Sequence, residues 1–467
     1  MASNTVRDVG EIKALVEKAR KAQKIVEGYS QRRVDELAAA MIYTLSRPAL
    51  AEEIAELAVK ETEMGNVESK INKLTLKMPA IFEQIKSVKT VGIIERIPEA
   101  GLTKIAKPIG VIAALVPSTN PEATPLFKGI LGLRGRNAVI FSPHPKSAGC
   151  TTRVVNIMKD ILKKNGAPED LFLILENPSV ANAKELMAQC DLTMATGSGA
   201  MVKSAYSSGK PAYGVGAGNA VIVIDETADI AKTAEKIRIG KTGDNASGCS
   251  AENSIVIHES IYNEMIEALI NEGAYLANQD EKSKLQKAIW VDGHLNREIV
   301  AKPVRTIADI AGIHIPENTK FIMVEEKGTG SDYPFSGEKL SLVLTVYKYK
   351  EFDDAIDLVN SIQHYSGLGH SCGIHSNNWE HIERFALKTY TTKVIVRQPH
   401  GKATSGDWSN GLSRTFSLGC GTWGGNIASE NITQKHYLNY TLIAEPIDKK
   451  PATDAEIYGD LLDNVVL

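Results

Sequence analysis

One cysteine, Cys249, lies in the segment TGDNASGCSAENS (residues 242–254), which is rich in Gly, Ser, Asn and Asp, residue types that favour turns. The pattern predicts a turn that gives way to a strand close to Cys249. A thiol in such a loop, near backbone donors, can ionise and attack a carbonyl carbon. Most free cysteines are instead small buried hydrophobic residues, and Cys150, Cys190 and Cys372 fit that description. The local sequence leaves Cys249 open to both interpretations.

Two glycine-rich segments could contact a nucleotide. GVGAGN begins at Gly214 and leads into a strand, whereas the dinucleotide-binding fingerprint lies between a strand and a helix. TMATGSGAMVKSAY has the better context, because Gly197 and Gly199 stand between an apolar strand and a predicted helix whose N-terminal amides could face a phosphate. This segment lacks the third glycine of the fingerprint, so a structural turn explains it equally well.

Metal and disulfide chemistry are not indicated. The five cysteines are odd in number, far apart and free of any C-x-x-C pair, and the ten histidines show no H-E-x-x-H spacing. We therefore expect no metal and no disulfide framework.

Composition places the chain among ordinary globular proteins. Its 467 residues are 43% hydrophobic and 23% charged, which fits two or three domains with filled cores. A net charge of -3 gives no general reason to bind nucleic acid or an anionic membrane. No apolar run approaches the ~20 residues that span a bilayer, and the charged N-terminus lacks a signal-peptide core. We expect a cytoplasmic protein.

The periodicity predicts an α/β fold. Apolar residues recur every three or four positions from about residue 9 to 60, which indicates helices, and strand-like patterns follow over 91–116. The short apolar runs AVIFS, LFLIL, LTMAT and AVIVI then alternate with helical stretches, and a second series of strands and helices begins after about residue 230. Such alternation is typical of doubly wound parallel sheets, here in two domains.

Several motifs together resemble a known family. GDNASGCSAENS, TGSGAMVKSAYSSGKPAYGVGAGN, VPSTNP, FSPHPK, GLGHSCGIHS and SLGCGTWGGNIASEN occur in an order similar to that of the CoA-acylating branch of the aldehyde dehydrogenase superfamily, from about residue 5 to 445. That branch includes acetaldehyde, succinate-semialdehyde and sulfoacetaldehyde dehydrogenases, and the aldehyde half of bifunctional aldehyde/alcohol dehydrogenases.

The resemblance implies a catalytic role for Cys249. In that role its thiol attacks the aldehyde, and the negative oxygen of the thiohemiacetal is stabilised by the backbone N–H of Cys249 and the side-chain amide of Asn120, which matches the family's oxyanion asparagine. The alternative for Asn120 is a turn residue before Pro121. His370, in GLGHS, lies in a family segment near the active site and is a candidate for proton transfer, with a packed core histidine as the alternative.

The resemblance also implies how the thioester is released. Hydrolytic members carry a glutamate that activates water at the position where this chain has Gly214. Without that base, a thiol has time to enter, so we expect CoA as co-substrate, ping-pong kinetics and a reversible reaction.

Cofactor contacts follow by the same comparison. NAD-specific relatives often carry a glutamate where this chain has Ser147, and Lys146 is adjacent, so NADP is allowed and slightly favoured over NAD. The motif of Glu338, which matches a ribose-binding glutamate, has Leu342 in place of its usual proline. The candidate cofactor residues are His144, Pro145, Lys146, Thr196, Gly197, Ser198, Gly199, Gly214, Gly216 and Glu338.

The substrate end contains several cations. The stretch from 397 to 414 holds Arg397, His400, Lys402 and Arg414, which would suit an aldehyde with an anionic tail, although a solvated charged loop is equally compatible. We rank sulfoacetaldehyde first, succinic semialdehyde second and acetaldehyde third.

The expected architecture has three parts. Residues 1–232 form a cofactor-binding domain, 233–430 a catalytic domain, and 91–107 with 431–467 a strand-rich extension, which in the resembling family adds to a partner's sheet in a homodimer or homotetramer. The last residues, DAEIYGDLLDNVVL, are expected to include a short helix.

Three other functions stay open. A hydrolytic aldehyde dehydrogenase would release a free acid without CoA, and an acyl-phosphate reductase of the same fold would take a phosphorylated substrate. A non-catalytic relative would bind nucleotide and have no reactive thiol.

Overall fold

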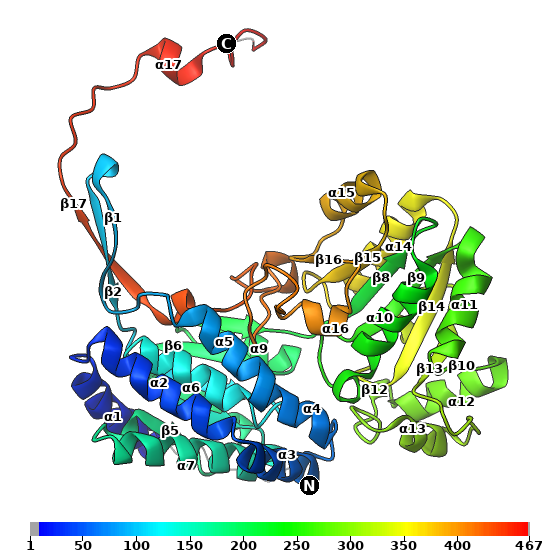
Figure 1. The fold of residues 1–467 in the computed structure, drawn as a ribbon, viewed down its shortest axis with the longest axis horizontal. Coiled ribbons are helices and arrows are strands. Elements are labelled where there is room, and N and C mark those ends of the chain that lie inside the picture. The colour runs from blue at the N-terminus through cyan, green and yellow to red at the C-terminus, as the bar shows by residue number, and fades with distance from the viewer. Residues whose placement is uncertain (1–8, 466–467) are drawn as a thin grey trace.

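The computed structural model describes residues 9–465 and has a mixed α/β fold (Figure 1). Two lobes each contain a parallel sheet with helices packed against it, and a narrow three-stranded sheet projects from the first lobe. The long C-terminal segment continues along this projection, away from both lobes. Within the described part of the chain, no helix is both long and apolar enough to cross a membrane.

The first lobe begins with helices, as the periodicity over 9–60 predicts. They are α1 (Val9–Val26), α2 (Gln31–Leu45), α3 (Pro48–Thr62), α4 (Val67–Asn72) and α5 (Met78–Ile85). A π-helical turn, Lys73–Lys77, joins α4 to α5 without a break. Such wider turns often occur at functional sites, because they change the direction in which side chains project.

The sheet of the first lobe has the strand order β5-β4-β3-β6-β7, and all its pairs are parallel. β3 is the first strand of this sheet in chain order. β4 and β5 follow on one side of it and β6 and β7 on the other, so β3 marks the topological switch point where such sheets bind ligands. The strands are β3 (Val111–Val116), β4 (Ala138–Pro143), β5 (Phe172–Ile174), β6 (Leu192–Thr196) and β7 (Ala212–Val215); the helices between them are α6 (Thr124–Arg134), α7 (Ala148–Lys164), α8 (Val180–Gln189) and α9 (Gly199–Tyr206).

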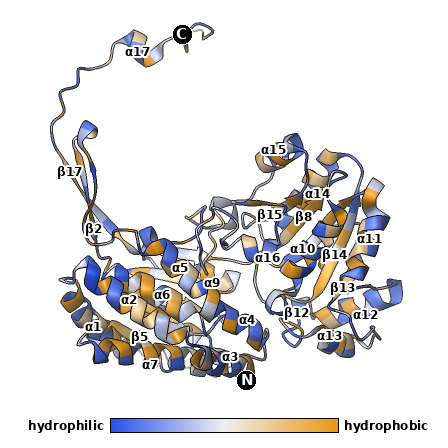
Figure 2. Ribbon diagram, in the orientation of Figure 1, coloured by the Kyte–Doolittle hydropathy of each residue, from blue (hydrophilic) through white to orange (hydrophobic). Residues whose placement is uncertain are grey.

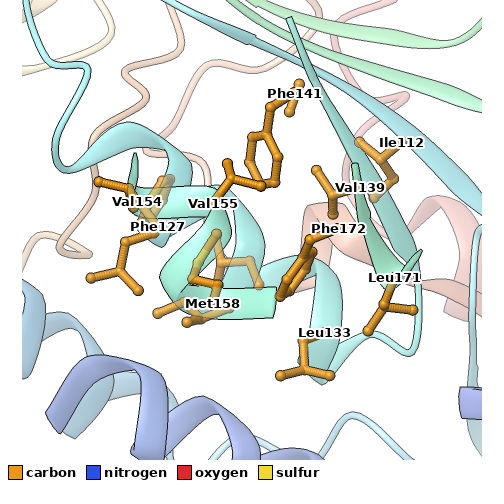
Figure 3. Close-up of a cluster of buried hydrophobic side chains, with 14 of the residues drawn as sticks. Ile112, Phe127, Leu133, Val139, Phe141, Val154, Val155, Met158, Leu171 and Phe172 are labelled. Carbon is orange, nitrogen blue, oxygen red and sulfur yellow. The ribbon is translucent and has the colours of Figure 1, made fainter. Parts of the chain in front are cut away.

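Apolar side chains hold this lobe together on both faces of the sheet. Every residue of β3 and β4 is buried. Phe141 of β4, Phe172 of β5 and Met158 of α7 meet in one cluster (Figure 3). Strands covered on both faces read as continuous apolar runs, which is why the sequence predicts them as buried.

The second lobe contains a seven-stranded parallel sheet in the order β10-β13-β14-β9-β8-β15-β16. Figure 2 shows the hydrophobic character of its strands, such as β14. The strands are β8 (Ala220–Ile224), β9 (Glu252–His258), β10 (Ala274–Leu276), β13 (Phe321–Glu325), β14 (Val343–Tyr349), β15 (Cys372–His375) and β16 (Val394–Val396), with a separate hairpin of β11 (Trp290–Val291) and β12 (His294–Leu295). The helices are α10 (Ile230–Thr242), α11 (Tyr262–Asn271), α12 (Gln279–Ile289), α13 (Val304–Ala311), α14 (Phe352–Tyr365), α15 (Trp379–Lys388) and α16 (His400–Ala403).

Strand β8 lies in the sheet of the second lobe, although the expected domain boundary places it in the first domain. The predicted cofactor-binding domain, 1–232, includes β8, yet β8 pairs with β9 and β15 of the second sheet. The sheets therefore separate between β7 and β8. A buried apolar run shows that a strand forms but not which neighbours it pairs with, so the sequence pattern could not place this strand.

The projecting sheet combines segments far apart in the sequence. β1 (Gly92–Ile97) pairs antiparallel with β2 (Leu102–Lys107), and β2 pairs antiparallel with β17 (Asn439–Ala444). The expected association of 91–107 with the C-terminal strand is confirmed. The chain then reaches the short helix α17 (Asp454–Tyr458), which the sequence also predicts.

Candidate active site

Cys249 lies in the loop between α10 and β9, just before the strand begins, as the turn pattern predicts. Three consecutive residues of this loop, Asp244, Asn245 and Ala246, have left-handed backbone angles, with φ of 48°, 52° and 57°. This conformation is unfavourable for residues other than glycine, so the surrounding structure must hold it. The strain occurs three residues before the cysteine and determines how the loop presents it.

The loop is held by the segment around α4. The carboxylate of Asp244 accepts hydrogen bonds from the backbone N–H of Asn66 at 2.9 Å, from Ser247 Oγ at 2.7 Å and from Lys73 Nζ. The side-chain amide of Asn245 donates to the backbone oxygen of Gly65 at 2.9 Å. The N-terminal helices thus fix the loop that carries Cys249, although nearly 180 residues separate them in the sequence.

His370 contacts Cys249 directly. Its Nε2 lies 3.0 Å from Cys249 Sγ, and its Nδ1 lies 2.8 Å from Ser371 Oγ. Burial, with a smaller contribution from the charge of Lys393, lowers the pKa of His370 to about 3, so the imidazole is neutral at physiological pH. His370 is therefore both a buried residue and a neighbour of the candidate nucleophile, so the two sequence-based alternatives are compatible.

Cys249 differs from the other cysteines in exposure. Cys150, Cys190, Cys372 and Cys420 are buried, whereas Cys249 is half-buried. Burial is also the main cause that raises the pKa of the Cys249 thiol, and the carboxylate of Glu338 adds to it. The resting thiol therefore keeps its proton and needs a base to ionise.

A small cavity beside Cys249 contains one carboxylate among its lining residues, that of Glu338. Burial raises the pKa of Glu338 to about 8. Glu338 Oε1 accepts a hydrogen bond from the backbone N–H of Gly218 at 3.0 Å. A Cβ at Gly218 would lie 2.0 Å from the backbone oxygen of Cys249, so only glycine allows the two backbones to approach this closely. The structure thus brings Glu338, a candidate cofactor residue, next to the candidate nucleophile.

Asn120 follows β3, at the switch point of the first sheet. Its side-chain oxygen accepts a hydrogen bond from Lys73 Nζ, and its Nδ2 lies 3.3 Å from Thr119 Oγ1. Because a lysine ammonium only donates, this contact assigns the oxygen of the amide and leaves the NH2 group to face other acceptors.

The remaining candidate cofactor residues lie mainly at the carboxyl ends of neighbouring strands. His144, Pro145 and Lys146 follow β4 and are exposed, and the segment from Thr196 to Gly199 connects β6 to α9. A Cβ at Gly199 or Gly216 would meet no atom within 4 Å, so the backbone there is open to a ligand. The arrangement fits a dinucleotide, which binds at the carboxyl edge of a doubly wound sheet.

A carboxylate near the loop of His144, Pro145 and Lys146 comes from a residue that was not predicted from the sequence. Glu61 of α3 accepts hydrogen bonds from the backbone N–H groups of Gly149 and Cys150, both at 2.7 Å, at the N-terminus of α7. Ser147, the residue expected at the position of the family's glutamate, lies two residues before Gly149. A negative charge is therefore present near the candidate ribose loop, supplied from a distant helix.

The four candidate substrate cations have other contacts or face solvent. Arg397 donates to the backbone oxygen of Ser376 at 2.6 Å, and buried His400 lies with Nδ1 2.7 Å from the backbone oxygen of Ser250. Arg414 pairs with Glu83 at 3.0 Å, and its guanidinium lies 3.9 Å above the Trp408 ring. Lys402 is exposed. Their substrate role stays a prediction.

Lys73 and Lys77 were not predicted from the sequence as site residues. Their four-residue spacing in KINKLTLK resembles the polar face of an ordinary solvated helix, so the pattern contained no signal that either ammonium turns inward. Only the tertiary contacts of the π-helical turn place them at the site.

One group of side chains in the described residues could hold a metal ion, away from Cys249. It consists of Asp225, Glu226 and His381. His381 Nδ1 lies 2.9 Å from Asp225 Oδ2, and Asp225 also accepts from Thr227, so hydrogen bonds already account for the arrangement.

Comparison with known proteins identifies the family. Residues 2–288 match the model described as the aldehyde dehydrogenase family. The chain is 42% identical over 455 residues to a sulfoacetaldehyde dehydrogenase of an Acholeplasma species, covering 96% of this chain and 94% of the relative. It is also 42% identical to the acylating sulfoacetaldehyde dehydrogenase of Bilophila wadsworthia (95% and 97% covered) and to the acetylating succinate-semialdehyde dehydrogenase of Clostridium kluyveri (92% and 95%).

Solved structures of aldehyde dehydrogenases are also similar to this chain. An acetylating aldehyde dehydrogenase from Geobacillus thermoglucosidasius superposes with a TM-score of 0.92 at 38% identity, covering 96% of this chain and 98% of that one. A Rhodopseudomonas palustris propionaldehyde dehydrogenase with bound CoA and an acylated cysteine gives 0.83 at 28% identity (93% and 97%), as does an engineered glycolyl-CoA reductase with bound NADP+ (93% and 96%). The chain belongs to the aldehyde dehydrogenase family, and its close relatives are acylating members.

Proposed function

We propose that this chain oxidises an aldehyde with an anionic tail to its acyl-CoA, reversibly, through a thioester on Cys249 and with reduction of NADP or NAD. The observation that carries the proposal is the 3.0 Å separation between Cys249 Sγ and His370 Nε2. A half-buried thiol beside a neutral imidazole is a nucleophile with its base in place.

In the first step, proton transfer accompanies nucleophilic attack. In the tautomer whose Nδ1–H donates to Ser371, Nε2 of His370 is free to accept the thiol proton. The sulfur of Cys249 attacks the aldehyde carbon as its proton moves to Nε2, and a C–S bond forms as the carbonyl π bond opens. The negative charge moves to the aldehyde oxygen.

Asn120 is proposed to stabilise that oxygen. Lys73 holds its side-chain oxygen, so its NH2 group is the part available to donate. The backbone N–H of Cys249 is the proposed second donor. Donors held in place before the reaction lose little energy to reorganisation, and removing one typically costs ~10² to 10³ in rate.

The cofactor is proposed to lie along the carboxyl edge of the first sheet. When bound, the nicotinamide supplies the acceptor for the hydride that leaves the aldehyde carbon. His144, Pro145 and Lys146 would hold the adenosine side, and Thr196, Gly197, Ser198 and Gly199 the pyrophosphate side. Glu338, Gly214 and Gly216 lie nearer the nicotinamide end in this proposal. Loss of hydride leaves an acyl thioester on Cys249.

CoA is proposed to release the acyl group. The CoA thiolate attacks the thioester carbon, the new C–S bond forms, and Cys249 leaves as thiolate. Gly214 supports release by CoA over release by water for two reasons. It has no carboxylate to activate water, and its surroundings leave no space for a larger side chain. A Cβ at this position would lie 2.6 Å from Val202 Cγ1 and 2.8 Å from Tyr206 Cε2, so a water-activating glutamate has no room here.

The preferred aldehyde is proposed to be sulfoacetaldehyde, with succinic semialdehyde second and acetaldehyde third. Relatives described as sulfoacetaldehyde and succinate-semialdehyde dehydrogenases share 42% identity with this chain, and both names denote aldehydes with an anionic group. The ranking concerns only the tail; the chemistry at the aldehyde is the same for all three.

The test is a spectrophotometric assay of reduced cofactor with each aldehyde, each cofactor, and with or without CoA. CoA-dependent turnover that is lost in Cys249→Ala supports the proposal. Turnover without CoA and a free acid product would instead indicate hydrolysis. No turnover with any of the three aldehydes, together with nucleotide binding, would favour a non-catalytic relative.

The projecting sheet is proposed to join subunits in a homodimer or homotetramer. β17 is exposed along its whole length, including the apolar side chains of Leu442 and Ile443, which are 59% and 45% exposed. An exposed edge strand with apolar side chains is a surface that another sheet can extend. Sedimentation of the full chain and of a chain ending before β17 tests this role.

A further inference from the structure

The π-helical turn between α4 and α5 presents a second lysine toward the site. Lys77 lies four residues after Lys73, about one turn further along the same segment. Lys73 reaches Asn120, whereas Lys77 Nζ reaches Ser405 Oγ at 2.6 Å and lies 4.4 Å from the centre of the Phe416 ring. The ammonium of Lys73 thus lies beside the proposed oxyanion donor, and the ammonium of Lys77 lies beside the segment that follows β16.

The surroundings of Lys77 leave its charge without a partner. Among the described residues, no carboxylate lies within 4 Å of its Nζ, whereas Lys70 and Lys73 each have two and Arg414 has one. A hydroxyl and an aromatic face contact the ammonium, and neither neutralises it. Lys77 is half-buried, so a ligand can reach it.

Lys77 interacts electrostatically with the charged and titratable groups around it, including Cys249. Burial, with a smaller contribution from the positive charge of Lys73, lowers the pKa of Lys77 to about 7, and the negative charges of Asp407 and of an ionised Cys249 oppose this shift. An anion bound beside the ammonium would restore the charged form. The charge of the Lys77 ammonium is therefore balanced only when a negatively charged group of a ligand lies beside it.

We propose that Lys77 binds the anionic tail of the aldehyde and determines the preference for charged over neutral substrates. This inference rests on the proposed function and assigns its specificity to one residue. The sulfonate or carboxylate accepts hydrogen bonds from Lys77 and from the hydroxyl of Ser405, the methylene groups pack against Phe416, and the aldehyde carbon faces Cys249. Arg397, His400 and Arg414, which were predicted for this role together with the exposed Lys402, keep their observed contacts.

The experiment compares kcat/KM for sulfoacetaldehyde and succinic semialdehyde with kcat/KM for propionaldehyde, a neutral aldehyde. In Lys77→Met the ratio of charged to neutral is expected to fall about 10- to 100-fold, the loss typical of a hydrogen bond to a charged group. Propionaldehyde turnover and KM for CoA should change little. Lys86→Met is the matched control, because Lys86 is an exposed lysine at the end of α5 that faces solvent.

A pH series separates this role from a structural one. Deprotonation of Lys77 above about pH 7 removes the cation, so the charged-to-neutral ratio of the wild-type enzyme should fall as pH rises from 6 to 9. In Lys77→Arg the cation persists at every pH in this range, so the ratio should be retained and should no longer fall. This variant also keeps the test decisive if Lys77→Met folds poorly.

The outcomes are distinguishable. An unchanged ratio in Lys77→Met, with charged aldehydes still preferred, overturns the role of Lys77 and leaves the proposed substrate class intact. A parallel rise in KM for CoA would place the bound anion on CoA and also overturn the inference. A wild-type preference for neutral aldehydes overturns both the substrate class and this inference, whereas CoA-dependent turnover would still support the acylating reaction.

Discussion

The side-chain oxygen of Asn120 accepts a hydrogen bond from Lys73 Nζ, and the same ammonium contacts the carboxylate of Asp244. Lys73 therefore connects the proposed oxyanion donor with the strained loop that carries Cys249. Its Nζ also lies 3.6 Å from Glu122, and Lys70 Nζ lies 3.7 Å from Glu122 and 3.6 Å from Asp244, so two cations share two buried carboxylates. Those carboxylates raise the pKa of Lys73, against the effect of burial, so it stays charged.

Replacing Lys73 should affect catalysis through Asn120. Asn120→Ala is expected to lower kcat by ~10² to 10³, the usual cost of one oxyanion donor. Lys73→Met should lower kcat in wild type more strongly than in the Asn120→Ala background, because the amide it orients is gone there. Equal factors in both backgrounds would contradict a positioning role. Melting temperatures of all variants separate loss of folding from loss of orientation.

The pH dependence of Cys249 should show no histidine ionisation near pH 6.5. Because the pKa of His370 is lowered to about 3, the imidazole is in its basic form at every pH above about 4. The rate of alkylation of Cys249 by iodoacetamide should rise only as the thiol itself ionises. His370→Ala should slow acyl transfer by ~10² or more, as expected for loss of a general base. Cys249→Ala identifies the labelled residue, and a step near pH 6.5 would show that His370 titrates normally.

Glu338 should oppose ionisation of Cys249 only above about pH 8. Below that pH its carboxyl group is largely protonated, and above it the negative charge raises the pKa of the thiol. In Glu338→Gln, alkylation of Cys249 should match wild type at pH 7 and be several-fold faster at pH 9. Glu338→Asp retains a charge and serves as the comparison. A variant slower than wild type at pH 9 would mean that Glu338 promotes thiolate formation.

Glu61 should restrict the use of NADP. Its carboxylate occupies the first amides of α7, close to the loop proposed to hold the adenosine ribose, where it would repel a 2′-phosphate. Glu61→Gln should raise kcat/KM for NADP relative to NAD by about fivefold to tenfold, as loss of on the order of 1 kcal/mol of repulsion implies. Glu53→Gln is the control, because Glu53 contacts α7 further along, at Arg153. If both variants have the same effect, the charge of Glu61 does not act locally.

Local sequence patterns predicted much of the fold. The helical start, the alternating strands and helices and the buried cysteines follow from periodicity and composition, because these depend on neighbouring residues and on which faces are buried. The position of Cys249 between a turn and a strand was predicted in the same way. The resemblance to a family brought Asn120 and His370 forward, which no local pattern would have selected.

Tertiary structure decided what depends on contacts between distant segments. β8 could have paired with either sheet by its apolar sequence, and only packing assigned it to the second lobe. The contact of Lys73 with Asn120 spans 47 residues, that of Glu61 with Gly149 of α7 spans 88, and that of Lys77 with Ser405 spans 328. Charged side chains on helices are normally solvated, so their inward direction has no signal in the sequence. The sequence by itself therefore determined the class of fold and the candidate nucleophile, whereas the electrostatic environment of that thiol was decided by the three-dimensional arrangement of the chain, because charges act through space and without regard to sequence distance.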